Sequence, residues 1–442
     1  MSFDRAYRET IDYLYALQKH GIKLALSNSV TLMALVGDPH RKFRSVHVAG
    51  TNGKGSTSSF IATMLQAAGY RVGLYTSPHL VSFAERIRIN NVLITEAKVV
   101  ELAGRVRDVA RKASLNPTFF EVTTTMAFTY FAEEGVDIAV IEVGMGGRLD
   151  STNVITPLVS VITNIELEHT EFLGSTLTQI AGEKAGIIKP GVPVVTGAAQ
   201  DEVITVIEQE AAAQQATVYR LSRDFMPGPV ASQHGQVFDY RGINTSFEKL
   251  RINMLGRYQV DNASLALATI ECLGNFGVVV DEPAARYGLE QARWEGRLEL
   301  VARRPDIYLD GAHNPASART LAATIRDLRP AYGRVVLIIG ILGDKDYQGI
   351  TSALVPLADH VVVTKPQYSR ALDARALASE IQKLHGSVET TETVADAIAA
   401  ARKAASLDDL VLITGSLYVV GDARAVLLPE SDRSGSLSGL KG

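Results

Sequence analysis

The chain of 442 residues has very little cysteine, since Cys272 is the only one. A single cysteine excludes an intrachain disulfide and is typical of proteins from a reducing compartment. Long apolar runs are absent too: no stretch approaches the roughly 20 apolar residues that span a membrane, and the first residues form no apolar signal core. We therefore expect a cytoplasmic protein with no membrane partner.

An excess of one charge is also missing, because 44 lysines and arginines stand against 48 aspartates and glutamates, a formal net charge of -4. This balance argues against a dedicated nucleic-acid binder, although it leaves room for a local basic pocket. Hydrophobic residues make up 46% and charged residues 21% of the chain, which excludes wholesale disorder. At roughly 100–200 residues per domain, the length allows about two to four domains.

Short apolar runs alternate with amphipathic helical patterns along most of the chain, which indicates βαβ units and a largely parallel sheet. In the first half, strands are predicted at 45–49, 138–143, 159–163 and 194–196, and helices at 7–18, 57–68, 96–112 and 123–133. Residues 224–249 are rich in glycine and polar residues, so we expect hairpins at a sheet edge there.

A second series of strands and helices begins after about Arg297. Strands are predicted at 307–309, 335–342, 360–364 and 410–414, and helices at 316–328, 374–384 and 394–404. Both series look complete around residues 294–298, so we predict two domains, residues 1–295 and 296–428. Residues 429–442 are rich in serine and glycine and are expected to form a disordered tail.

The most specific local pattern is SVHVAGTNGKGST at residues 45–57. An apolar strand leads into a glycine-rich turn that carries a lysine and a hydroxyl, and a helix follows. Such a turn surrounds phosphate with backbone N–H groups, the helix adds partial positive charge, and the lysine reaches the terminal phosphates. A plain glycine turn is the simpler interpretation, but the combination favours ATP binding by Gly53, Lys54, Gly55 and Ser56.

The spacing departs from the usual GxxxxGK[ST], because Gly55 stands between Lys54 and the hydroxyl. The variant GTNGKGS resembles the ATP loop of the Mur ligase superfamily, and within it that of folylpolyglutamate synthases and dihydrofolate synthases. Further motifs follow in this family's order as far as about Tyr418. The resemblance implies an α/β fold: an N-terminal P-loop ATPase-type doubly wound, mostly parallel sheet and a smaller C-terminal α/β Rossmann-like domain.

Three polar residues, Ser77, Glu142 and His169, follow apolar strands. Ligands bind at the carboxyl ends of parallel strands, so a hydroxyl, a carboxylate and an imidazole there could hold Mg²⁺ beside the ATP loop. Individually they read more simply as a turn residue, a cap and a surface histidine. The resemblance implies that all three are magnesium ligands, with ATP, two Mg²⁺ ions and K⁺ as the candidate cofactors.

Lys184 lies in the stretch IAGEKAGII. The resemblance implies that CO₂ carbamylates this lysine and that the new carboxylate helps to bind a second magnesium ion. Carbamylation requires a neutral amine, and hence a pKa lowered by burial or by nearby cations. The simpler interpretation is a lysine on a helix surface, paired with Glu183.

Two further stretches, MLGRYQVDNAS and DGAHNP, look on their own like a capped helix start and a strand-to-helix turn. A third stretch, WEGRLE at residues 294–299, resembles the family's linker between the two domains. The resemblance implies nucleotide contacts for Asn262, Arg297 and Asp310 and an active-site role for His313. Two family positions differ here, with Tyr258 in place of a histidine and Glu295 in place of a proline.

The stretch Thr118-Phe119-Phe120-Glu121 places two aromatic rings and a carboxylate at a helix start. A flat pterin favours stacking on an aromatic ring and a polar partner at its edge. The simpler interpretation is a core helix start with a capping glutamate. The resemblance implies that these four residues bind dihydropteroate and that Leu149, Asp150 and Ser151 line the same pocket.

The phosphate loop and the resemblance together imply an ATP-dependent acid–amino-acid ligase with Lys54 as a catalytic residue, and the resemblance adds Lys184 and His313. The acceptor carboxylate would become an acyl phosphate, which the amine of L-glutamate then attacks. Dihydropteroate, the glutamate tail of folates, or both would be the acceptors, and the dihydropteroate-type stretch at residues 118–121 favours a bifunctional enzyme. The resemblance also implies a monomer. Residues 344–346 and Ser416 are the candidates for binding glutamate. A cell-wall Mur ligase and a P-loop switch ATPase remain the alternatives.

Overall fold

The computed structural model describes residues 3–21, 25–232 and 235–429. They form two compact units. The first comprises the chain up to residue 79 together with 83–253 and 259–293, and the second comprises 80–82, 254–258 and the chain from 294 onward. Two short segments that precede residue 294, 80–82 and 254–258, therefore pack with the second unit. The predicted tail lies outside the described residues, apart from Pro429.

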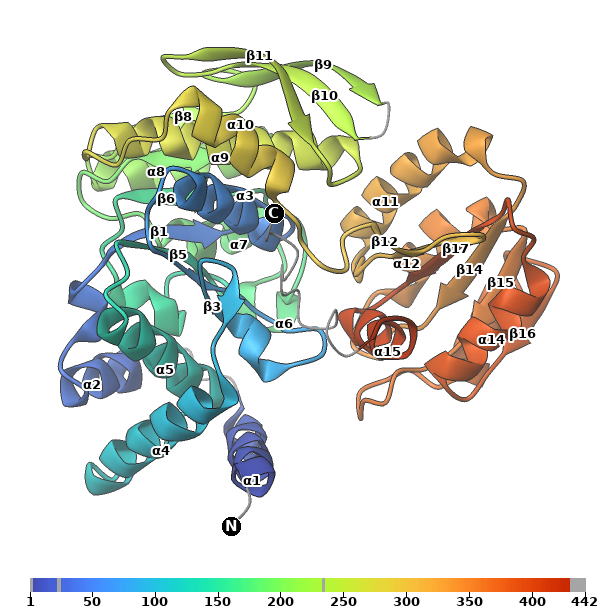
Figure 1. Cartoon of the computed structure of the whole chain (residues 1–442), viewed down its shortest axis with the longest axis horizontal. Coiled ribbons are helices and arrows are strands. Elements are labelled where there is room, and N and C mark those ends of the chain that lie inside the picture. The colour runs from blue at the N-terminus through green and yellow to red at the C-terminus, as the bar shows by residue number, and fades with distance from the viewer. Residues whose placement is uncertain (1–2, 22–24, 233–234, 430–442) are drawn as a thin grey trace, which may run out of the picture. The chain divides into compact units, whose positions relative to one another are not determined.

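The first unit is built on an eight-stranded sheet with the order β4-β3-β2-β5-β1-β6-β7-β8. Figure 1 labels β3, β5, β1, β6 and β8 of this sheet. Only the pairs β2–β3 and β3–β4 are antiparallel, which confirms the mostly parallel sheet. The strands are β1 (Arg44–Ala49), β2 (Val72–Tyr75), β3 (Ile87–Ile89), β4 (Val92–Leu93), β5 (Ile138–Glu142), β6 (Val159–Ile162), β7 (Val194–Thr196) and β8 (Val218–Arg220).

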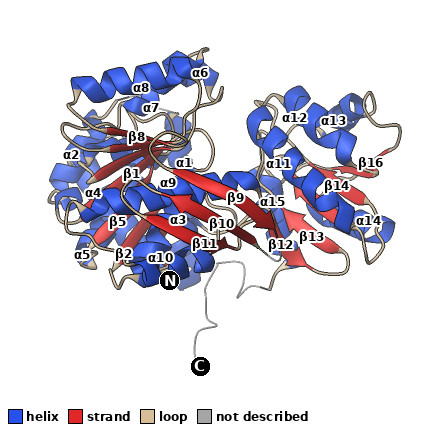
Figure 2. Cartoon of the chain, turned by 90° about the horizontal axis from the view of Figure 1, so that it is seen from above, coloured by secondary structure: helices blue, strands red, loops and turns tan. Residues whose placement is uncertain are grey.

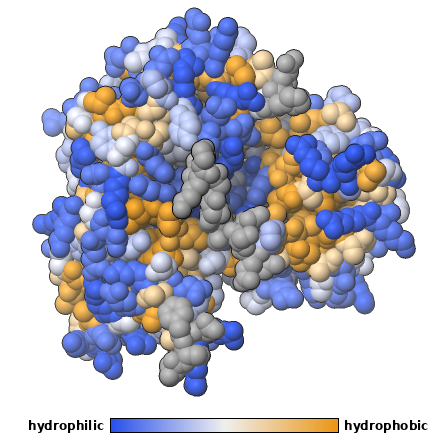
Figure 3. Space-filling view, viewed as in Figure 1, coloured by the Kyte–Doolittle hydropathy of each residue, from blue (hydrophilic) through white to orange (hydrophobic). Residues whose placement is uncertain are grey.

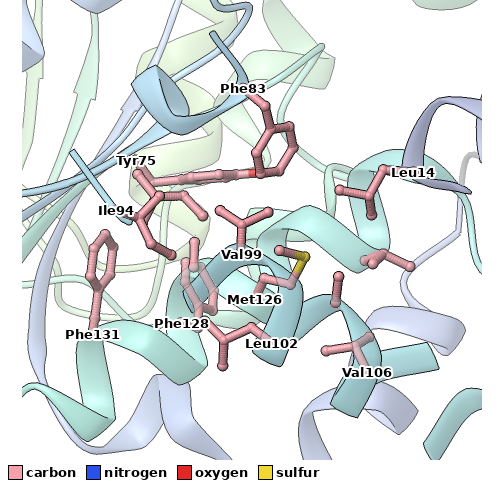
Figure 4. Packing of buried hydrophobic residues seen from close by; sticks show 14 of the residues in the cluster. Leu14, Tyr75, Phe83, Ile94, Val99, Leu102, Val106, Met126, Phe128 and Phe131 are labelled. Carbon is pink, nitrogen blue, oxygen red and sulfur yellow. The ribbon is translucent and has the colours of Figure 1, made fainter. Parts of the chain in front are cut away.

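Helices cover both faces of this sheet, as a doubly wound fold requires. The helices of this unit are α1 (Phe3–Ala16), α2 (Ser27–Leu35), α3 (Lys54–Ala67), α4 (Glu96–Lys112), α5 (Phe119–Glu133), α6 (Thr170–Leu173), α7 (Leu177–Ala185), α8 (Asp201–Ala213), α9 (Arg257–Gly274) and α10 (Glu282–Gln291). One core joins α1, α4 and α5 to the sheet, where Leu14, Val99 and Phe128 pack near Tyr75 (Figure 4).

Residues 226–252 form an antiparallel sheet of their own: β9 (Met226–Ser232), β10 (Gln236–Arg241) and β11 (Ser246–Ile252), in the order β11-β10-β9. The prediction of hairpins is right, but their placement at the edge of the large sheet is wrong. That edge is occupied by β8, and the small sheet is tied to α9 instead, where the Tyr240 hydroxyl donates to Glu271 at 2.8 Å.

The second unit contains a six-stranded sheet with the order β12-β13-β17-β14-β15-β16, parallel except for β12. Its strands are β12 (Glu299–Ala302), β13 (Asp306–Leu309), β14 (Val335–Ile339), β15 (His360–Val363), β16 (Val388–Thr390) and β17 (Leu410–Thr414), and its helices are α11 (Pro315–Leu328), α12 (Tyr347–Leu354), α13 (Ala374–Ile381), α14 (Val394–Ala404) and α15 (Leu417–Leu427). The predicted C-terminal α/β fold is confirmed (Figure 2).

Strand alternation divides the second unit into two cores. Leu337 and Leu412 pack with α11, α12 and α13, whereas their neighbours Ile338 and Ile413 pack with α14 and α15. Successive side chains of a strand point to opposite faces, so nearly continuous apolar strands need helices on both sides.

Two helix starts differ from the predicted ones in a way that affects the site. Helix α3 begins at Lys54 rather than at residue 57, and α5 begins at Phe119 rather than at residue 123. The lysine and serine of the phosphate loop therefore belong to the first turn of a helix, and Thr118 is a helix cap.

Hydrophilic residues cover most of the face in Figure 3, and apolar residues show in smaller areas among them. Among the residues that the structure describes, no helix combines the length and apolar character that crossing a membrane requires.

Candidate active site

The phosphate loop connects β1 to α3, and two of its glycines are required by geometry. Gly50 and Gly53 have φ of +142° and +85°, which strains other residues. A Cβ at Gly50 would lie 1.9 Å from the Thr163 hydroxyl oxygen, and a Cβ at Gly53 would lie 2.4 Å from Oδ1 of Asn262. The loop therefore packs closely against Thr163, which follows β6, and against Asn262 of α9.

Lys54 curls over this loop, and its Nζ donates to the carbonyls of Gly50 at 3.0 Å and Thr51 at 3.1 Å. Gly55 and Ser56 follow in the first turn of α3. The free backbone N–H groups of that turn and the helix dipole favour an anion at this point. The geometry suits a phosphate chain, as the sequence predicted.

Strands β2, β5, β1 and β6 are neighbours, so the residues that follow them gather at one edge of the sheet. Glu142 ends β5 and is only 4% exposed, and its Oε2 accepts a hydrogen bond of 2.9 Å from the backbone N–H of Ser77 after β2. Two of the three predicted magnesium ligands therefore meet. His169 stands at the exposed start of α6, in a left-handed conformation with φ of 51°.

The chemical types of these three side chains suit a magnesium ion. The set includes a hydroxyl and a buried carboxylate that meet at the strand edge and an exposed imidazole at the start of α6, and such oxygen and nitrogen ligands would leave the remaining positions of Mg²⁺ to phosphate oxygens and water. Within the described residues, no three His, Cys, Asp or Glu side chains form a cluster suited to a metal. Of the three predicted ligands only Glu142 and His169 are of these types, so the predicted site would not form such a cluster.

Lys184 of α7 is buried at 5% exposure, and its Nζ donates to the same Gly50 carbonyl at 2.8 Å. Burial, followed by the nearby Lys54 cation, lowers the pKa of Lys184 to about 7. Glu183 pairs with Arg148 at 2.7 Å instead. The interpretation of Lys184 as a surface lysine paired with Glu183 is therefore wrong. A buried, readily neutral amine beside the phosphate loop is what carbamylation needs.

The start of α5 forms a capping box. The hydroxyl of Thr118 accepts from the N–H of Glu121 at 3.3 Å, and Oε2 of Glu121 accepts from the N–H of Thr118 at 2.6 Å. The simpler interpretation of a capping glutamate is therefore correct for Glu121. Of the two rings, Phe119 is buried while Phe120 is partly exposed, so Phe120 is the ring that can meet a ligand.

Three residues that the sequence did not single out surround Phe119. The Arg86 guanidinium lies 5.1 Å from the ring centroid, and the Tyr15 ring stacks at 5.9 Å. His79 joins them, because its Nδ1 accepts from Nε of Arg86 at 2.7 Å and its Nε2 lies 3.0 Å from the Tyr15 hydroxyl. Burial, followed by the charge of Arg86, lowers the pKa of His79 to about 3. Tyr15 comes from α1, too distant in the sequence for any local pattern to reveal it.

Asp150 is buried in the turn after β5, together with Ser151, and Leu149 is half-buried. Its carboxylate accepts from the N–H of Met145 at 2.9 Å and from the N–H and hydroxyl of Thr152 at 3.0 and 2.5 Å. Burial raises the pKa of Asp150 against the opposing effect of these bonds. The turn is thus organised around one buried carboxylate.

In the second unit, Asp310 directly follows β13, the strand that precedes α11. Its oxygens accept from the N–H groups of Leu298 and Ala312, both at 2.9 Å, and burial raises its pKa against the effect of Arg297. A Cβ at Gly311 would lie 2.4 Å from Nη1 of Arg297. The structure therefore brings Arg297 and Asp310 together within one turn.

His313 lies in the same turn, with its Nδ1 2.7 Å from the Gly311 carbonyl oxygen. The two candidate regions for glutamate lie at helix starts: Asp346 accepts from Gly349 N–H at 2.8 Å to cap α12, and Ser416 accepts from Val419 N–H at 3.1 Å to cap α15.

Comparison with known proteins identifies both parts of the chain. Residues 48–270 match the Mur ligase middle domain, and residues 296–417 match the Mur ligase glutamate ligase domain. The chain is 39% identical over 428 residues to dihydrofolate synthase/folylpolyglutamate synthase of Bacillus subtilis, covering 95% of this chain and 98% of that one. The chain belongs to the dihydrofolate synthase/folylpolyglutamate synthase family.

Solved structures of this family agree with the fold. Mycobacterium tuberculosis folylpolyglutamate synthase complexed with ADP superimposes with a TM-score of 0.91 at 35% identity, covering 97% of this chain and 100% of that one. An Escherichia coli family member in complex with DHPP and ADP gives 0.86 at 31% identity, covering 94% and 97%. As a member of the dihydrofolate synthase/folylpolyglutamate synthase family, the protein is an ATP-dependent ligase. The alternative of a P-loop switch ATPase is therefore wrong.

Proposed function

We propose that this ligase joins L-glutamate both to dihydropteroate and to the glutamate tail of folates. The observation that carries the ATP-dependent ligation is the pair of lysines, Lys54 and Lys184, which share the Gly50 carbonyl beside Glu142 at the strand edge, and the two acceptors are inferred from the relatives. Relatives from Bacillus subtilis, Mycobacterium tuberculosis and Escherichia coli carry both activities in their names, whereas the Lacticaseibacillus casei relative is named folylpolyglutamate synthase alone.

The reaction joins two anions, so the site must supply positive charge. A carboxylate oxygen of the acceptor attacks the γ-phosphorus of ATP, which gives an acyl phosphate and ADP. The α-amine of glutamate then attacks the carbonyl carbon, loses a proton and expels inorganic phosphate. The N–H groups of Gly53, Gly55 and Ser56 hold the phosphates, and Lys54 offsets the repulsion between carboxylate and triphosphate.

The metal ligands are Ser77, Glu142 and His169 in this proposal. Bound Mg²⁺ would supply Lewis acidity to the phosphate oxygens. The buried position of Glu142 supports its assignment, because a carboxylate at 4% exposure favours a cationic partner.

Carbamylated Lys184 would hold a second magnesium ion. In that modification, the neutral amine attacks the carbon of CO₂, and one proton is released as the N–C bond forms. A pKa of about 7 leaves about half of the amine neutral at pH 7.

The acceptor is assigned to the turn between Thr118 and Glu121 and to residues Leu149, Asp150 and Ser151. Phe120 supplies a ring face for the pterin, because it is the more exposed of the two phenylalanines. Glu121 and Asp150 already accept bonds from backbone N–H groups, so they shape the pocket.

The remaining nucleotide contacts are assigned to Asn262, Arg297 and Asp310, and a catalytic role is assigned to His313. Arg297 is a permanent cation, suited to phosphate oxygens. For glutamate we propose Lys345 and Ser416, a cation and a hydroxyl that suit a carboxylate.

The test is an assay of phosphate release and glutamylated product with ATP, L-glutamate and one acceptor at a time. Dihydropteroate and a tetrahydrofolate monoglutamate should each support turnover, and Lys54→Ala should abolish both. Turnover of only one acceptor would contradict the double activity.

A further inference from the structure

A chain of buried hydrogen bonds runs through the sheet behind the acceptor turn. His47 lies on the central strand β1 at 0% exposure, and its Nε2 is 2.8 Å from the hydroxyl oxygen of Thr152, also at 0% exposure. The Thr152 hydroxyl oxygen lies 2.5 Å from Oδ1 of Asp150. Three polar side chains from two distant parts of the sequence are therefore joined in a line.

The protons along this line have one consistent arrangement. Both oxygens of Asp150 accept backbone N–H groups, so Asp150 is an acceptor and the single Thr152 hydroxyl proton points to it. The Thr152 oxygen must then accept from His47, which carries its proton on Nε2. Burial, followed by the charge of Lys189, lowers the pKa of His47 to about 3, so this histidine stays neutral.

The line continues from Asp150 to Phe120. Asp150 holds the backbone N–H of Met145 at 2.9 Å and also bonds to that of Gly144. A Cβ at Gly144 would lie 2.4 Å from Cζ of Phe120, so this backbone packs directly against the ring. The bonds of Thr152 thus fix the surface on which Phe120 rests.

We propose that His47 is a positioning residue for the acceptor: through Thr152 and Asp150 it fixes the Gly144–Met145 backbone and hence the ring of Phe120. The proposal rests on the proposed function, in which Phe120 meets the pterin. His47 is fully buried and touches no substrate.

A merely structural histidine is the competing explanation. Nδ1 of His47 is buried and has no hydrogen-bond partner in the described part of the chain. An unpaired buried nitrogen is unfavourable, and an apolar residue would suit the middle of a central strand better. A histidine at this position is explained if its Nε2–H group is needed to hold the hydroxyl of Thr152. The two roles predict different kinetics: loss of a positioning residue should raise the KM for dihydropteroate alone, whereas loss of a merely structural residue should not act on that KM selectively.

The decisive variants change Thr152, which lies outside the strand that carries the ATP loop. Thr152→Val keeps the shape and removes the hydroxyl, and Thr152→Ser keeps the hydroxyl. We expect Thr152→Val to raise the KM for dihydropteroate about tenfold, the effect of losing one buried hydrogen bond. The kcat and the KM for ATP should stay within about twofold, and Thr152→Ser should behave as the wild type.

A second pair of variants tests the histidine itself. The amide nitrogen of glutamine can take the place of Nε2, whereas the shorter asparagine matches only Nδ1. His47→Gln should therefore keep the wild-type KM for dihydropteroate, and His47→Asn should raise it as Thr152→Val does. This pair decides the question if Thr152→Val fails to fold. Because His47 stays neutral, the pH profile of kcat should be unchanged in His47→Gln.

Thr351→Val is the matched control, since Thr351 is also buried, at 2%, and its hydroxyl donates to the Tyr347 carbonyl within α12. Three results would overturn the positioning role. They are equal changes in the KM for ATP and for dihydropteroate, a Thr152→Ser protein as impaired as Thr152→Val, and a shifted pH profile of kcat in His47→Gln. A wild-type enzyme without activity on dihydropteroate would instead overturn the proposed function, and this inference with it.

Discussion

Replacing Lys184 by methionine tests the buried amine at the centre of the site. Lys184 is 5% exposed, and its pKa falls from 10.5 to about 7. The unfolded chain therefore binds a proton between pH 7 and 10.5 that the folded chain releases, so this lysine lowers the free energy of unfolding as the pH falls through that window. Below about pH 7 the free energy of unfolding is reduced by the full amount, and above about pH 10.5 Lys184 no longer reduces it.

The size of this destabilisation follows from the pKa shift of Lys184. A difference of about 3.5 pKa units corresponds to roughly 5 kcal/mol at about 1.4 kcal/mol per unit. Removal of the hydrogen bond from Lys184 to Gly50 offsets about 1 kcal/mol of that gain. We therefore expect Lys184→Met to be more stable than the wild type by a few kcal/mol at pH 6, with the difference shrinking as the pH rises toward 10.

Urea unfolding of both proteins in CO₂-free buffer between pH 6 and 10 measures this difference. The variant should be inactive in the ligase assay, and the wild type alone should give a carbamate signal with ¹³C-labelled bicarbonate in ¹³C NMR. A Lys184→Met protein less stable than the wild type at pH 6 would show that the lysine is favourably charged in the folded state, and the reasoning would be refuted.

Three further substitutions test the rest of the site. Glu142→Ala should abolish turnover of both acceptors while the circular dichroism spectrum stays that of a folded protein; retained phosphate release would rule out its role in metal binding. Gly53→Ala introduces a Cβ 2.4 Å from Oδ1 of Asn262 at a φ of +85°, so we expect the KM for ATP to rise at least about tenfold and the melting temperature to fall. Phe120→Leu should raise the KM for dihydropteroate several-fold and leave that for ATP unchanged, and equal effects on both would contradict its assignment to the pterin.

Much of the fold could be predicted because its signals are local. The alternation of apolar strands and amphipathic helices indicated two α/β units, and GTNGKGS revealed the phosphate loop from a continuous run of residues. Helix boundaries were less accurate, because the cap at Thr118 and the glycine at residue 53 start their helices before the apolar periodicity begins.

By itself, then, the sequence determined the α/β class, the phosphate loop, the family resemblance and the residues from which a site could be drawn. Tertiary structure alone decided how those residues act: that Lys184 is buried against Gly50, that Phe120 rather than Phe119 is accessible, and that His47 meets Thr152 across 105 positions of sequence. The physical reason is that pKa values, exposure and hydrogen-bond partners depend on what surrounds a side chain. In a parallel sheet, those surroundings come from strands that are distant along the chain.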